Sequence, residues 1–348
     1  MFQHPESSRP LPPAALRPDG AVTIVAEAAQ GYEGDLALAR LLVRAAAAAG
    51  ADVVKLQLVY ADELTLPAHR HHRLFRDLEM PDTAWHEVAA EARRCGIGLA
   101  FDVFGPRSLD LAMACGAHAV KIHASDVFNH PLVAGALRRA PHVYLSAGGI
   151  SADEVDALLR RHAPDWSRLT LLSGFQAEPT ATGDNHLARL GALRQRFPSL
   201  GLGFMDHADG AGDEATWLAV LALPFGVSVI EKHVTLDRAL ALEDYVSAVA
   251  PDRFAAFVAR VRAAEAALGR DDLALTQGER AYRRKALKIT VAVGSLPVGH
   301  RVEAGDVRLV RTAIDDRSEP IYQLESAIGR TLRCAVEADR PVYEDDLA

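Results

Sequence analysis

Cysteine is scarce in this chain, which has three among 348 residues. Cys95, Cys115 and Cys334 are too few and too widely spaced for a disulfide framework or a zinc knuckle. Cys95 and Cys115 each precede a glycine at the end of a predicted helix, where a small buried apolar residue is common. The spacing predicts a structural role for all three cysteines.

The chain also lacks a basic excess, a long apolar run and a secretory leader. Its formal net charge is −8 and its pI is about 6.0, which argues against a nucleic-acid partner. No apolar run approaches the roughly 18 residues that cross a bilayer, and no charged segment followed by an apolar one stands at the start. We therefore expect a cytoplasmic protein with no membrane partner. The overall charge does not exclude a local positive pocket for an anionic small molecule.

What the sequence contains is a regular alternation of short β-branched or aliphatic runs with longer helical segments. Strands are predicted at residues 22–27, 53–57, 98–102, 119–122, 142–146, 169–172, 200–204 and 227–231. Helical periodicity occupies segments between them, such as 35–49, 82–95, 152–161 and 188–197. Eight strand–helix units over about 250 residues predict a (β/α)₈ barrel. A doubly wound open sheet is the alternative, but no GxGxxG follows the first strand.

Changes in composition divide the chain into four segments. Residues 1–20 are polar and rich in proline, which predicts a flexible arm. The barrel is expected over 21–269 and closes with an amphipathic helix at 251–268. Residues 270–285 are dense in charge and predict a linker. Short strands at 288–293 and 307–311, with turn signals around them, predict a small β-rich domain over 286–348.

The eighth predicted strand carries charge at its end, in the stretch VSVIEKHVTLDR. Side chains alternate along a strand, so Glu231 and His233 point the same way and Lys232 points away. A carboxylate and an imidazole side by side at the end of a buried strand indicate a site, although a strand that simply leaves the core would look similar. Lys232 is expected to belong to the outer packing of the barrel.

Polar side chains end nearly every predicted strand. The active site of a (β/α)₈ barrel lies at the C-terminal ends of its strands, so these side chains are expected to share one site. They are Glu27, Lys55, Gln57, Asp102, Lys121, Ser146, Gln176, Glu178, Asp206, His207, Glu231 and His233.

The residue types suggest their chemistry. His207 and His233 end neighbouring strands and can share one divalent ion such as Mn, Fe, Co, Ni or Zn, or they are two unrelated polar residues. Lys55 and Lys121 suit a carboxylate or phosphate, and one of them could instead form a Schiff base. Glu27 is a candidate general base or hydrogen-bond orienter, or only the partner of a lysine.

Ser146 precedes Ala147, Gly148 and Gly149 at a predicted helix start. Small residues there allow backbone N–H groups to approach an anion, and a simple tight turn is the alternative.

Several of these stretches together resemble the sialic-acid synthase family. They are VAEAAQGYEGDLALA, AGADVVKLQ, AVKIHASDVFNHPL, YLSAGGIS, DHADG, VIEKHVTLDR, AIGRTL and EDDL, and the similarity covers residues 22–347. The resemblance implies a (β/α)₈ barrel followed by an antifreeze-like (SAF) domain. It also implies condensation of phosphoenolpyruvate with N-acetylmannosamine or a related amino sugar. A divalent metal is implied, Mn²⁺ first and Mg²⁺, Co²⁺ or Zn²⁺ as alternatives, in a homodimer whose small domains cap the partner's barrel.

The resemblance also implies roles for individual residues. His207 and His233 match the metal ligands, and Glu27 matches an acid at the first strand. Lys55 and Lys121 match the lysines beside the phosphoenolpyruvate carboxylate, and Ser146 matches a phosphate ligand. The acceptor-binding positions are matched by Gln57, Glu231, Asp244 and, in the small domain, Arg311.

Other positions depart from the family pattern, mostly on the donor side. Asp102 stands where the family has threonine, Met205 replaces a serine, and Ser125 is a serine displaced by one position. Gln176 and Glu178 replace an asparagine and a tyrosine in the loop after the sixth strand. The changes keep phosphoenolpyruvate condensation as the first hypothesis. An aldolase, lyase or other enolate reaction with a donor lacking phosphate is the second, and a non-catalytic sugar-binding protein is the third.

Overall fold

The computed structural model describes residues 20–162, 166–269, 272–314 and 318–348. These residues form two compact units, and the division falls after Gly269. The arm predicted for residues 1–20 lies outside the described residues except for Gly20. Among the described helices, none is long and apolar enough to cross a membrane.

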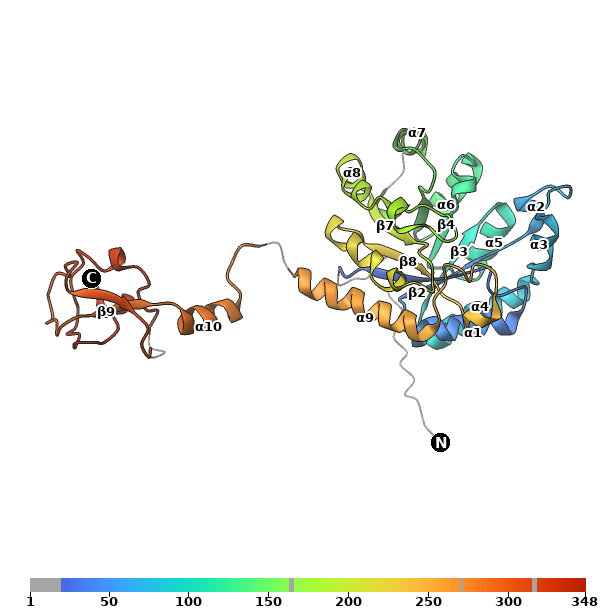
Figure 1. Cartoon of the computed structure of the whole chain (residues 1–348). Helices are drawn as coiled ribbons and strands as arrows, with labels where there is room; N and C mark the ends of the chain where they lie inside the picture. The colour runs from blue at the N-terminus through green and yellow to red at the C-terminus, as the bar shows by residue number, and fades with distance from the viewer. Residues whose placement is uncertain (1–19, 163–165, 270–271, 315–317) are drawn as a thin grey trace. The chain divides into compact units, whose positions relative to one another are not determined.

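The first unit is a closed barrel of eight parallel strands that pair in chain order (Figure 1). Its strands are β1 (Thr23–Ala29), β2 (Val53–Gln57), β3 (Gly98–Val103), β4 (Ala119–Ile122), β5 (Val143–Ser146), β6 (Leu169–Ser173), β7 (Gly201–Asp206) and β8 (Val229–His233). The predicted (β/α)₈ barrel is confirmed, and the open-sheet alternative is wrong. The expected strands differ from the observed ones by at most two residues at either end, as is usual where strand ends fray.

Helices cover the outside of the barrel. They are α1 (Leu36–Ala48), α4 (Asp82–Cys95), α5 (Pro106–Ala114), α6 (His130–Arg139), α7 (Ala152–His162), α8 (Ala188–Arg196) and α9 (Pro251–Leu268), with the short α2 (Ala61–Leu64) and α3 (His72–Asp77) before α4. Between β7 and β8 the described chain forms two 3-10 segments instead of an α-helix, η4 (Asp213–Thr216) and η5 (Leu218–Phe225). Pro224 lies inside η5, and a proline lacks the N–H that an α-helix needs there.

The barrel lumen has an apolar floor and a polar upper layer because side chains alternate along each strand. One buried cluster forms the floor: Val25, Val53, Ala100, Ala119, Tyr144, Leu172, Met205 and Val229. Two residues further along the strands, the same face carries Glu27, Lys55, Asp102, Lys121 and Glu231. The strand register places Glu27 beside Lys55 and His233, and Asp102 beside Lys121. The polar layer therefore lies at the C-terminal end of the lumen.

Lys232 points away from this layer, as predicted, and is fully buried on the outer face of the sheet. Its ammonium lies 3.1 Å from Asp206 Oδ2 on the neighbouring strand β7. The second oxygen of Asp206 accepts the backbone N–H of Ala208 at 2.9 Å. Asp206, which had been grouped with the polar strand ends, is thus part of an ion pair outside the lumen.

The second unit is a small β-rich domain, as predicted. Strands β9 (Ile289–Ala292) and β10 (Val307–Val310) pair antiparallel over a separate apolar core. The segment expected to be a linker contains helix α10 (Gln277–Ala286). Thr276 and Glu279 form a capping box at its start, and its charged face leaves the helix without a buried residue. The density of charged residues indicated solvent exposure, and the helix was not predicted because it has no apolar face.

The buried pair of Lys232 and Asp206 gives a stability test. We expect Lys232→Met to lower the free energy of unfolding by about 3–5 kcal/mol, because it leaves a buried carboxylate without a partner. The double variant Lys232→Met, Asp206→Asn removes that charge and keeps an acceptor for Ala208. It should recover at least half of the loss in urea denaturation. A double variant as unstable as the single one would contradict this view of the pair.

Candidate active site

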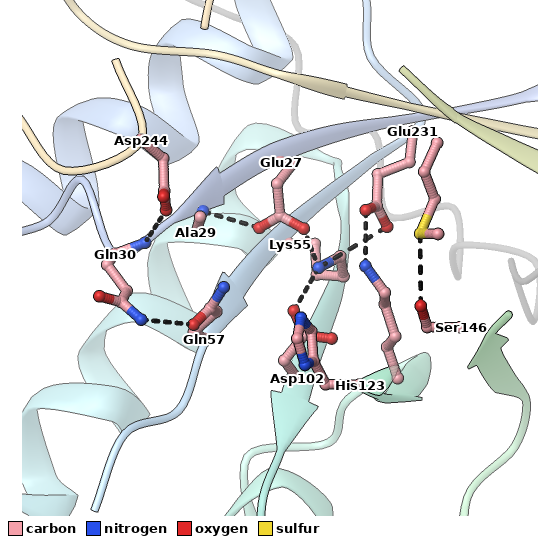
Figure 2. A network of polar contacts seen from close by, with 12 residues as sticks. Glu27, Ala29, Gln30, Lys55, Gln57, Asp102, His123, Ser146, Glu231 and Asp244 are labelled. Carbon is pink, nitrogen blue, oxygen red and sulfur yellow. Dashed lines mark hydrogen bonds and ion pairs between the residues drawn. The ribbon is translucent and has the colours of Figure 1, made fainter. Parts of the chain in front are cut away.

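Five charged side chains form a buried cluster at the C-terminal end of the lumen, here called the charged cluster: Glu27, Lys55, Asp102, Lys121 and Glu231. The Lys55 ammonium contacts Glu27, lies 2.6 Å from Asp102 Oδ2 and lies 3.6 Å from Glu231 Oε2. Lys121 lies 2.6 Å from Glu231 Oε1. Figure 2 shows Glu27, Asp102 and Glu231 converging on Lys55. The cluster thus joins residues from five strands.

Electrostatics couple the members of the charged cluster. Burial lowers the pKa of Lys55, and the charge of Lys121 lowers it further, against the opposing effect of Asp102 and Glu231. Burial acts on Lys121 too, but Asp102 and Glu231 outweigh it and raise the pKa of that lysine. The two lysines likewise outweigh burial and lower the pKa of Glu231. Three carboxylates and two ammonium groups leave one formal negative charge.

Two buried acceptor atoms in the charged cluster lack a hydrogen-bond donor. Among the described residues, neither Asp102 Oδ1 nor Glu231 Oε2 has a hydrogen-bond partner. A buried acceptor without a donor is costly, and the cost is offset here by the ion pairs that the same carboxylates make with Lys55 and Lys121.

His207 and His233 lie together beside the charged cluster. Their ring centroids are 4.9 Å apart, and both residues are buried. Burial lowers the pKa of His207 to about 4 and that of His233 well below its usual value, so both imidazoles are neutral at pH 7. His207 Nδ1 is buried and has no hydrogen-bond partner among the described residues. Two neutral rings with such an atom are suited to a divalent ion.

The histidine pair supplies few protein ligands. Within the described parts of the chain, no group of three or more His, Cys, Asp or Glu side chains has metal-binding geometry. Any ion held by His207 and His233 would therefore take its other ligands from water or substrate.

A second set of polar groups, here called the Gln30 side, lies on the side of Glu27 that faces away from Lys55 (Figure 2). It consists of Gln30, Gln57 and Asp244. The Gln30 amide donates to Gln57 Oε1 at 2.7 Å, and its backbone N–H donates to Asp244 Oδ2 at 3.4 Å. Glu27 accepts the backbone N–H of Ala29 at 2.7 Å, which fixes its carboxylate (Figure 2). Gln57 and Asp244, both predicted from the sequence, are thus linked through a residue that was missed.

Glu178 and Asp244 form a hydrogen-bonded carboxyl pair. Desolvation, followed by the charges of Asp244 and Glu243, raises the pKa of Glu178 to about 8. Desolvation also raises the pKa of Asp244. Two carboxyl groups in contact do not both ionise readily, so the pair holds a proton near neutral pH.

The loop ends of β4, β5 and β6 meet around Gln176. Its Oε1 lies 3.4 Å from the Ser146 hydroxyl, and its amide nitrogen lies 3.5 Å from His123 Nε2. Ser146 also lies 3.9 Å from the sulfur of Met205. His123 was missed, although it follows Lys121 by two positions and therefore continues the same face of the strand.

Two further residues were predicted to contact the substrate. Ser125 is exposed, and its hydroxyl donates to Asp126 at 2.7 Å and lies 3.1 Å from His123 Nδ1. Arg311 is exposed in the small unit, directly after β10. The substrate contacts expected for both residues stay predictions.

This chain is similar in sequence to known proteins. The model of the NeuB family matches residues 42–272, and the SAF domain model matches residues 289–348. The N,N'-diacetyllegionaminic acid synthase of Legionella pneumophila is 26% identical over 83% of this chain and 85% of its own length. A pseudaminic acid synthase of Campylobacter jejuni is 28% identical over 83% of this chain and 85% of its own.

A solved structure is similar over most of the chain. The N-acetylneuraminic acid synthetase of Leptospira borgpetersenii, in complex with citrate, superposes with a TM-score of 0.70 at 25% identity. The match covers 76% of this chain and 92% of that one.

The carboxyl pair of Glu178 and Asp244 predicts a pH-dependent stability. The pKa of Glu178 is raised from 4.5 to about 8, so the folded chain binds more protons than the unfolded chain between these values. Stability from this group is present at low pH and is lost as the pH rises toward 8. We expect Glu178→Gln to stabilise the protein more at pH 9 than at pH 5, as measured by urea denaturation. Glu87→Gln, at an exposed site on α4, is the control, and equal effects of Glu178→Gln at both pH values would contradict the prediction.

Proposed function

Because this chain belongs to the NeuB family, we propose that it is a sugar-acid synthase that condenses phosphoenolpyruvate with an aldose or amino sugar. The observation that carries the proposal is the charged cluster beside two neutral histidines at the C-terminal end of the barrel. Such a site offers ammonium groups for an anionic donor and imidazoles for a metal ion. The product would be a 3-deoxy-2-keto acid.

The proposed reaction consumes phosphoenolpyruvate, the sugar aldehyde and one water, forms one carbon–carbon bond and releases one phosphate. C3 of phosphoenolpyruvate attacks the aldehyde carbon of the open-chain sugar, whose oxygen becomes a hydroxyl. Water adds to C2, and the bond from C2 to the phosphate oxygen breaks, which leaves the 2-keto group and inorganic phosphate.

Residues of the charged cluster are assigned to the donor. Lys121 and Lys55 would bind its carboxylate. Each ammonium faces the lumen and lies 2.6 Å from a carboxylate oxygen of the protein, and the donor carboxylate can replace that oxygen as its partner. The Ser146 hydroxyl and the Gln176 amide would hydrogen-bond the phosphate at the ends of β5 and β6.

The Gln30 side of the site is assigned to the acceptor. Gln57, Gln30 and Asp244 offer both amide donors and carboxyl acceptors, which suits sugar hydroxyl groups. Glu27 lies between this side and Lys55, so it is placed to accept a proton or to orient the acceptor.

A divalent ion is part of the proposal. His207 and His233 would hold it, as their neutral rings and the unpartnered Nδ1 of His207 support. When bound, such an ion supplies a Lewis acid that polarises a carbonyl oxygen. Both histidines are buried, which limits the access of bulk water to their rings.

One observation favours a second candidate function. Asp102 lies 2.6 Å from Lys55 and faces the position proposed for the donor carboxylate. This extra carboxylate would repel a highly charged donor such as phosphoenolpyruvate. The second candidate is therefore an aldol reaction with a less charged 2-keto acid donor, such as pyruvate.

The proposed reaction predicts phosphate release. Purified protein with Mn²⁺ should release phosphate from phosphoenolpyruvate in the presence of one member of a panel of aldoses and N-acyl hexosamines. We expect His233→Ala to slow the release about 100-fold or more, since a Lewis acid contributes several kcal/mol. Glu87→Gln, on the outer helix α4, should leave the rate unchanged. Release from no acceptor in the panel would contradict the synthase proposal.

The choice of donor is tested at Asp102. If phosphoenolpyruvate is the donor, Asp102→Thr should lower its KM about tenfold or more, because Lys55 loses a competing charge-assisted partner. Asp102→Asn keeps the size of the side chain and should shift KM in the same direction. If both variants raise KM, and the unchanged enzyme consumes pyruvate with the same acceptors, the second candidate is correct.

A further inference from the structure

A cavity of about 780 Å³ lies outside the groups described above, between α7 and α8. Its walls are the loop that follows β5, the loop that follows β6 and the facing sides of the two helices. Arg196 of α8 bonds to Asp153 and Asp156 of α7 and holds the helices together at this place. The volume of the cavity falls in the range of small-molecule sites, which is roughly 300–1,000 Å³.

The cavity adjoins the site in the barrel lumen. None of the residues assigned to the donor, the acceptor or the metal ion lines it. Gly148 borders both, because a Cβ on it would lie only 2.8 Å from the Gly174 carbonyl oxygen and 2.8 Å from Gln176 Oε1. Gly149, with a φ of 75°, has open space where a side chain would lie. The two sites are therefore neighbours with different lining residues.

An uncompensated positive charge lies in the cavity wall. Arg189 of α8, an exposed residue, lines the cavity, and its guanidinium has no ion-pair or hydrogen-bond partner among the described residues. Arg196 also lines it, but Asp153 and Asp156 neutralise that guanidinium. Asp184 is the acidic residue among the lining side chains, and it does not pair with Arg189. The free guanidinium is suited to a carboxylate or phosphate group.

The same cavity wall carries the side chains of Asn185 and Phe175. Asn185 lines it and donates its amide hydrogens to the carbonyl oxygens of Ala181 and Thr182, at 3.1 and 3.2 Å. Its Oδ1 has no donor within the described part of the chain, but it has almost no accessible surface, so a ligand in the cavity does not reach it. Phe175, 50% exposed, presents an aromatic surface in the same wall. An exposed aromatic ring beside a guanidinium is suited to a sugar ring that carries an anionic group.

We propose that this cavity, which no assigned role explains, is a second binding site for a hydroxylated anion, either a sugar phosphate or a sugar carboxylate. Arg189 binds the anionic group, and Phe175 packs against the sugar ring. The loop after β5 joins the cavity wall to Ser146, so the two sites share one short segment of chain. This site stands whether or not the barrel condenses phosphoenolpyruvate.

The test is isothermal titration of the full chain with glucose 6-phosphate, gluconate and glucose. At least one of the two anions should bind, and glucose should bind at least tenfold more weakly. Arg189→Gln should weaken binding of the anion about tenfold or more, the cost of losing a charge-assisted hydrogen bond. Ala192→Trp, which fills the cavity from an exposed position on α8, should abolish it. Arg160→Gln, an exposed arginine in the last turn of α7, is the matched control and should bind normally.

Three outcomes would overturn the proposal. The first is that neither anion binds the unchanged protein at about 10 mM, a concentration high enough to reveal weak binding. The second is that Arg189→Gln and Ala192→Trp bind the anion as the unchanged protein does, which would place binding elsewhere, such as in the barrel lumen. The third is that glucose binds as tightly as the anions, which would remove the role of the guanidinium. Circular dichroism of each variant verifies the fold, and the ratio of the two anion affinities identifies the head group.

Discussion

Two ammonium groups buried in a barrel lumen must be balanced by carboxylates, and the rest of the site depends on that requirement. Lys55 is fully buried and touches carboxylates from β1, β3 and β8, while Lys121 of β4 pairs with β8 across the lumen. A buried charge without a partner costs several kcal/mol. Because Glu231 of β8 pairs with lysines of β2 and β4, this charge balance requires β8 to close the barrel against β1. The charged cluster therefore forms only when the barrel closes.

The sequence predicted the barrel and most of the polar layer because both follow from the period-two alternation of strands. Glu27, Lys55, Asp102, Lys121, Glu231 and the histidines face the lumen for that reason alone. Alternation says nothing of pairing, so the contacts of Asp102 with Lys55 and of Gln30 with Gln57 were beyond its reach. Helix α10 was missed because its residues are all outside the core, which leaves no apolar periodicity to detect.

The site divides its charge unequally between two sides. The charged cluster carries lysines against carboxylates, whereas the Gln30 side carries amides and the protonated pair of Glu178 and Asp244. Beside the charged cluster, the two histidines are neutral because burial lowers their pKa values. In the proposed reaction, an ionic donor and a neutral, hydroxyl-rich acceptor would therefore meet different surfaces, and the charge of each surface would select its substrate. Asp102 would shift this selection toward less charged donors.

Lys232 lies between Glu231 and His233 in the chain, yet it faces the opposite side of the sheet and pairs with Asp206. A shift of β8 by one residue would drive the lysine into the lumen and carry the carboxylate and the imidazole into the apolar layer under the helices. Each of these three polar groups would then be buried without its partner. The outer ion pair of Lys232 and Asp206 therefore favours the observed register of β8 against β7. It lies outside the lumen, but the positions of Glu231 and His233 inside the lumen depend on that register.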